Sequence, residues 1–75
     1  MAKRNLNPPS AHHIVPVSRG GQNGSNVAII GMRDHQAYHH LFSNMKPDEI
    51  IEHLVKHYWN RQWDWVRLAL RKQDL

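Results

Sequence analysis

The sequence predicts a small α+β domain in which a β-hairpin precedes a histidine-bearing helix and one or two further helices. Two short apolar runs, residues 14–17 and 27–30, flank a stretch rich in glycine and asparagine, a pattern typical of a hairpin. From residue 34 onward the apolar positions recur with a helical period. The chain of 75 residues suits one domain, near the length at which a single apolar core is marginal.

The first strand is expected over residues 14–17, because three of these four residues are β-branched. Because proline has no amide hydrogen, Pro16 is compatible with this strand only if the strand lies at a sheet edge or ends at Pro16. The next eight residues, 18–25, contain three glycines and Asn23, and they predict a long hairpin loop. Residues 27–30 are then expected to return as the second strand, which Gly31 ends.

The helix expected over residues 34–43 has the most informative spacing. His35 and His39 are four residues apart, so their side chains project about 40° from each other and share one face. His40 projects roughly 140° from His35 and is expected to point elsewhere. An apolar stripe lies beside the pair and indicates a packed side, formed by Ala37, Tyr38, Leu41 and Phe42.

A second pair of adjacent histidines, His12 and His13, stands at the start of the predicted hairpin. Together with the helical cluster, this pair places five of the seven histidines at the two ends of one supersecondary unit. Imidazole nitrogens are common ligands of transition metals, and two such clusters invite one shared ion.

The remainder, residues 45–75, is predicted to be a helical extension that packs on this core. Pro47 suits the first position of a helix. Six apolar residues with helical period follow and are interpreted as core: Ile50, Ile51, Leu54, Val55, Tyr58 and Trp59. Residues 60–62 either break this helix or continue it, and residues 63–72 again have a helical pattern.

Three further features of the extension have competing interpretations. The tryptophans could stack on nucleobases, but we expect them to be buried, since they offer a small domain large apolar area. His53 and His57 are also four residues apart, yet no third ligand is evident, so we expect a solvated face. The basic residues of the last helix could follow a phosphate backbone or simply be solvated.

Residues 1–11 are predicted to be a flexible basic segment, because Lys3 and Arg4 precede a run of turn-forming residues. These two side chains and Arg19, which lies beside two glycines, are candidate nucleic-acid contacts, with solvated surface charge as the alternative. The formal net charge of +4 weakly favours a polyanionic partner. The chain contains no cysteine, signal peptide or transmembrane run, so we expect a cytoplasmic protein without membrane contact.

The central stretch closely resembles the HNH endonucleases. The resemblance rests on the sequence His-His-Ile-Val-Pro from His12, on Arg-Gly-Gly from Arg19, and on Asn26 followed by an apolar run. His35 then lies nine residues beyond the asparagine, and His39 four residues further. The resemblance implies a ββα-metal fold over residues 12–44 with one divalent ion. Many members also bind a structural zinc through cysteines, two of them at the positions occupied here by Gly31 and Asp34. This chain contains no cysteine.

Carried over by position, the resemblance implies that His12, His35 and His39 bind the metal. It implies that His13 is the general base and that Asn26 orients the base and its loop. A neutral imidazole can accept a proton from water near neutral pH, and neighbouring strand residues face opposite ways, so His12 and His13 can serve different tasks. Three histidines suit zinc, nickel or manganese, whereas magnesium prefers oxygen ligands, and the sequence leaves the ion open.

Three functions follow as expectations. The first is a metal-dependent HNH endonuclease, bacterial or phage-encoded, that hydrolyses DNA phosphodiester bonds to leave 5′-phosphate and 3′-hydroxyl ends. The second is a non-catalytic, metal-stapled nucleic-acid-binding module. The third is a small adaptor that acts with a larger nuclease partner. For the nuclease we expect weak sequence preference, or specificity gained from a homodimer or a larger protein partner.

Overall fold

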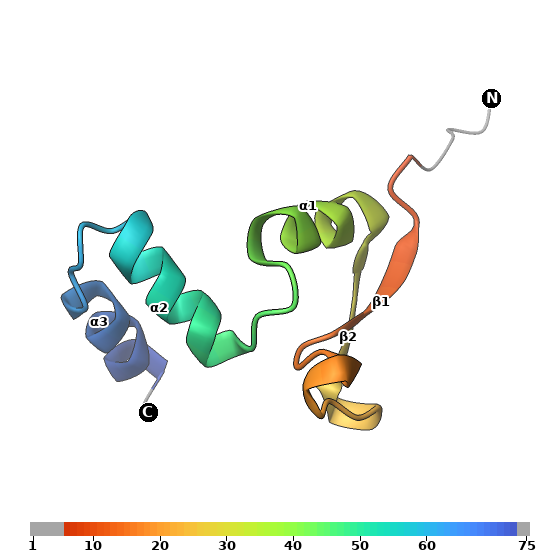
Figure 1. Cartoon of the computed structure of the whole chain (residues 1–75), viewed down its shortest axis with the longest axis horizontal. Coiled ribbons are helices and arrows are strands. Elements are labelled where there is room, and N and C mark those ends of the chain that lie inside the picture. Colours follow the sequence, from red (N-terminus) through yellow and green to blue (C-terminus); the bar gives the residue numbers. More distant parts are fainter. Residues whose placement is uncertain (1–5, 74–75) are drawn as a thin grey trace.

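The computed structural model describes residues 6–73; Lys3 and Arg4 therefore lie outside the described part. It is a small α+β fold, in which a two-stranded antiparallel hairpin is followed by three helices (Figure 1). The strands are β1 (Pro9–His13) and β2 (Val27–Gly31), and two short 3-10 turns, Val17–Arg19 and Gly24–Asn26, lie between them. The predicted order of hairpin, histidine-bearing helix and one or two further helices is confirmed, with two helices present.

β1 lies earlier in the chain than the sequence suggested, so the strand predicted over residues 14–17 is wrong. Pro9 pairs with Gly31 and His13 with Val27, and the pairing begins inside the segment expected to be flexible. Pro9 is tolerated because it is the first residue of an edge strand. The carbonyl of Pro16 accepts hydrogen bonds from the amides of Arg19 and Gly21, at 2.8 and 2.9 Å, so the predicted strand turns instead.

α1 (Met32–Phe42) starts directly after β2 and packs against both strands. Its start is tied to the chain that leads into β1. The amide of Met32 donates to the carbonyl of Pro8 at 2.7 Å, and the amide of Arg33 donates to Asn7 Oδ1 at 2.7 Å. The latter bond satisfies one of the free amides at the helix N-terminus. These bonds set how α1 lies on the hairpin, and hence where its histidines project.

α2 (Pro47–His57) and α3 (Asp64–Gln73) form a helical pair beside the hairpin and α1 (Figure 1). Pro47 is the first helical residue, as predicted, and the Glu49 side chain accepts a hydrogen bond from the Lys46 amide at 2.8 Å. The helical conformation is interrupted between α2 and α3 at Asn60 and Arg61, whose backbone has left-handed φ angles of 49° and 59°. This break settles the alternative left open for residues 60–62.

Apolar burial is sparse in the described residues. Of the predicted stripe on α2, only Ile50 and Val55 are buried, whereas Tyr58 is 59% exposed. The expectation that the tryptophans form a core is wrong, since Trp59, Trp63 and Trp65 are 40%, 39% and 60% exposed. Within the described part of the chain, neither α2 nor α3 makes extensive contacts with another element, so three indoles are not enclosed. No helix in residues 6–73 is long and apolar enough to cross a membrane.

Candidate metal centre

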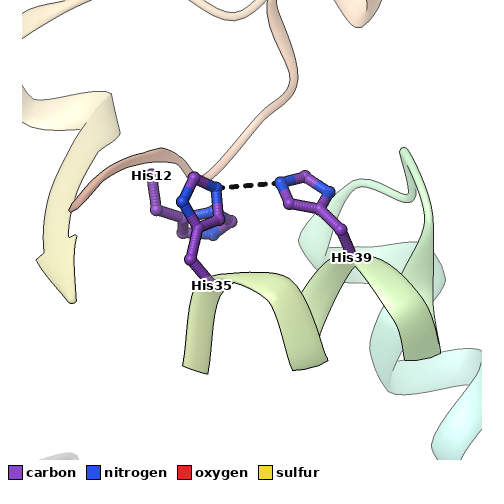
Figure 2. A group of neighbouring side chains, drawn as sticks. All are labelled: His12, His35 and His39. Carbon is purple, nitrogen blue, oxygen red and sulfur yellow. Dashed lines mark hydrogen bonds between the residues drawn. The ribbon is translucent and has the colours of Figure 1, made fainter. Parts of the chain in front are cut away.

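Three histidines converge where α1 crosses β1. His35 and His39 project from consecutive turns of α1, and His12 projects from β1 toward them (Figure 2). Each offers one ring nitrogen, and these three nitrogens all lie within 4.8 Å of one another. No other group of three or more potential ligands is found in residues 6–73. The predicted ligands are therefore brought together, and the site could hold one metal ion.

The rings of His35 and His39 are oriented by partners behind them. His39 Nδ1 lies 3.1 Å from the carbonyl oxygen of Ser43, which can only accept, so Nδ1 carries the hydrogen. His35 Nδ1 lies 2.7 Å from Ser10 Oγ. The two Nε2 atoms then face each other at 3.0 Å (Figure 2). Hydrogen-bonded Nδ1 atoms and converging Nε2 atoms are typical of histidines that bind a metal.

The Ser10 hydroxyl can hydrogen-bond to His35 both without a cation and with a cation between His35 and His39. Neutral His39 presents a lone pair at Nε2, so the observed contact requires His35 to donate from Nε2 while Ser10 donates to His35 Nδ1. If both Nε2 atoms held a cation, the hydrogen of His35 would lie on Nδ1 and the hydroxyl would accept it. A hydroxyl can donate or accept, so Ser10 orients the ring in both states.

His12 supplies the buried side of the site. It is only 6% exposed, and its Nδ1 is buried without a hydrogen-bond partner among the described residues. Burial lowers the pKa of His12, and the nearby His35, His39 and His13 lower it further. The Tyr38 ring covers it, with centroids 4.3 Å apart. A neutral, buried imidazole with an unpartnered nitrogen beside two others fits a transition-metal ion.

His13, the predicted base, follows His12 on β1 and is half-buried. Its Nε2 lies 3.0 Å from Oδ1 of Asn23, in the hairpin loop. The amide oxygen can only accept, so in neutral His13 the hydrogen sits on Nε2 and the lone pair is on Nδ1. His13 lines a pocket of about 310 Å³ together with His35 and His39. One pocket therefore contains a potential proton acceptor and two potential metal ligands.

Asn26 stabilises the hairpin loop through hydrogen bonds from its side chain to the backbone. Its Oδ1 accepts from the Val15 amide at 2.8 Å, and its Nδ2 donates to the carbonyls of Val15 and Gln22, both at 2.9 Å. The side chain that contacts His13 is that of Asn23 instead. Sequence reasoning did not assign Asn23 or Ser10 a role; the only signal was that Asn23 lies in the same turn.

Arg19 is held by Asn44 and by Glu49 on α2. Its Nη2 lies 3.0 Å from Oε2 of Glu49, and its Nη1 donates to the Asn44 carbonyl at 3.3 Å. The hydrogen bond from Arg19, with that from the Lys46 amide, lowers the pKa of Glu49. The other two ion pairs of the described residues lie within single helices, so this one alone joins the hairpin loop to α2.

The second histidine pair is only partly solvated, as His53 is half-buried and His57 is exposed. The ring centroids of His53 and His57 are 4.8 Å apart, and those of His53 and Phe42 are 6.4 Å apart. His40 is exposed on α1, as its projection predicted.

No protein-family model, curated protein or solved structure matches this chain. Its chemistry is therefore inferred from the site. Three convergent imidazoles can hold a Lewis-acidic cation, and a fourth imidazole on the same pocket can accept a proton. These two capabilities together are what metal-assisted hydrolysis requires.

Proposed function

We propose that this protein is a metal-dependent endonuclease of the HNH kind, with a ββα-metal core, that hydrolyses DNA to leave 5′-phosphate and 3′-hydroxyl ends. The observation that carries the proposal is the pocket shared by His13, His35 and His39. Hydrolysis of a phosphodiester needs positive charge at the phosphate oxygens and an activated water. The residues around this pocket can meet both needs.

In the proposed reaction, Nδ1 of His13 takes a proton from water while Asn23 holds the ring through Nε2. The water oxygen bonds to phosphorus as the bond from phosphorus to the 3′ oxygen breaks, and the departing 3′ oxygen takes a proton from solvent water. A divalent ion held by His12, His35 and His39 would supply positive charge to a phosphate oxygen and the departing oxygen. Asn26 keeps the loop fixed, so that His13 stays beside the ligands.

The test uses metal-stripped protein and supercoiled plasmid, with magnesium, manganese, nickel or zinc added back. We expect cleavage by the parent, cleavage lost in metal-loaded His13→Ala, and cleavage and metal binding lost together in His35→Ala. His40→Ala is the matched control, because His40 is exposed on the same helix but outside the cluster. If His13→Ala cleaves as fast as the parent at equal metal occupancy, the proposed role of His13 is wrong.

A second candidate function is a metal-stapled nucleic-acid-binding module. The sparse core favours it, since the buried residues in 6–73 are His12, Pro16, Ile50 and Val55 alone. A metal that joins β1 to α1 would then serve folding alone. Metal-dependent folding and retained DNA binding, without cleavage under any of the four ions, would favour this module over the nuclease.

A further inference from the structure

We infer that the outer face of α3 binds single-stranded nucleic acid, with Trp65 stacking on a base and Arg67 and Arg71 contacting phosphates. This inference deepens the proposed nuclease function by locating a substrate contact away from the metal centre. It rests on that function only for the identity of the substrate.

Charge is segregated between the two C-terminal helices. α3 carries three basic residues and one acidic residue, a net charge of +2. α2 carries one lysine and three acidic residues, a net charge of −2 with neutral histidines. A polyanion is therefore attracted to α3 and repelled by α2.

A hollow of about 420 Å³ lies on α3 between its basic side chains. Trp65 and Leu68 form its apolar part, Arg67 and Arg71 its basic part, and Gln62 and Asp64 complete it. The indole of Trp65 is 60% exposed and makes no ring contact with another aromatic side chain in residues 6–73. An exposed aromatic face between cationic groups is the combination by which proteins bind single strands.

Neither arginine is held by a strong ion pair within residues 6–73, so both can contact phosphate. Arg71 forms no ion pair within residues 6–73. Arg67 lies 2.7 Å from Asp64, but this pair is 65% and 86% exposed, so water screens it and little holds it together. A bidentate phosphate contact would compete with it readily.

Stacking on Trp65 favours an unpaired strand over a duplex. A base must leave its helical stack to place its face on Trp65, and this costs least in a single strand. α3 lies at the end of the molecule opposite β1, along an axis of 47 Å (Figure 1). The helix would therefore hold a strand well outside the histidine pocket.

The test measures binding by metal-loaded His13→Ala protein, so that cleavage does not interfere. Fluorescence anisotropy of a labelled oligonucleotide of about 16 nucleotides is followed across salt concentrations. We expect Trp65→Ala to weaken binding roughly 5- to 150-fold, and Trp65→Phe to stay closer to the parent. We expect Arg71→Ala to reduce the slope of log K against log salt by about 0.7.

Two control variants remove a similar exposed apolar side chain and a similar positive charge outside the hollow. Leu70→Ala removes a side chain that is 65% exposed on α3 but does not line the hollow. Arg33→Ala removes one exposed positive charge from α1. Both are expected to bind within about twofold of the parent, and circular dichroism verifies the fold of every variant.

The inference is overturned if folded Trp65→Ala and Arg71→Ala bind as the parent does, if the controls lose as much affinity, or if the duplex binds more tightly than the single strand. It is also overturned if Leu68→Arg converts a dimer to a monomer with binding unchanged, since the hollow would then be a contact between copies. Absence of plasmid cleavage by the parent would count against the nuclease alone and leave these binding results intact.

Discussion

Replacing Ser10 by alanine removes a group that orients the candidate metal ligand His35 without removing that ligand. Ser10 is half-buried on β1, and its hydroxyl lies 2.7 Å from His35 Nδ1. Without it, the ring of His35 loses its hydrogen-bond partner at Nδ1. Loss of such an outer partner typically weakens metal binding by about 10- to 100-fold.

The effect on stability follows from linkage between binding and folding. With metal at about 100 times the parent dissociation constant, binding stabilises the fold by about 2.7 kcal/mol. The same metal concentration gives about 1.4 kcal/mol after a tenfold loss of affinity and about 0.4 kcal/mol after a hundredfold loss. For so small a domain, the metal-induced rise in Tm should therefore shrink by roughly 5–18 °C.

The assay combines a competitive chelator titration with thermal unfolding at fixed free metal, for the parent and for Ser10→Ala. Ser25→Ala is the matched control, because Ser25 is exposed and its side chain makes no hydrogen bond among the described residues. The orienting role is refuted if the metal affinity of Ser10→Ala stays within about twofold of the control and its metal-induced rise in Tm within about 2 °C.

Two further predictions concern the loop and its link to α2. Gly21→Ala should destabilise the fold by about 1–3 kcal/mol in denaturant unfolding, because a Cβ there would overlap the Val15 carbonyl and press on Asn26 Nδ2 at 2.8 Å; Gly20→Ala, whose Cβ would meet nothing within 4 Å, should cost only its left-handed strain. Glu49→Gln should lower Tm at neutral pH. The lowered pKa of Glu49 means that its stabilisation is present above the usual 4.5 and lost as pH falls through the lowered value, so the Tm difference should vanish in acid. A difference that persists below that range would contradict this reasoning.

The histidine cluster was predictable because its elements follow strong local rules. Residues four apart share a helical face wherever the helix begins, so an error of two residues in the start of α1 left His35 and His39 together. His12 was found through the resemblance to the HNH enzymes, although the strand that carries it was placed wrongly. β-Branched content favoured residues 14–17, and the turn at Pro16 outweighed it.

The contacts around the cluster could not be predicted, because they depend on tertiary distances. Ser10 meets His35 only because β1 pairs in the register that sets Ser10 opposite Ile30, next to the start of α1. Asn23 reaches His13 across the loop, which no local pattern encodes. The tryptophans were expected inside because large apolar area is usually buried, but a pair of short helices has no layer to cover them.

The architecture makes His13 the residue that separates the two candidate functions. A two-stranded hairpin is marginal alone, and here a metal bound by His12 on β1 and by His35 on α1 would join segments 23 positions apart. A variant of a candidate ligand is therefore expected to lose stability together with any cleavage, and cannot tell a catalytic ion from a structural one. His13 lies beside the ligands but is outside the cluster that could hold the ion. Its loss should leave metal binding and folding intact, so any loss of cleavage can be assigned to chemistry.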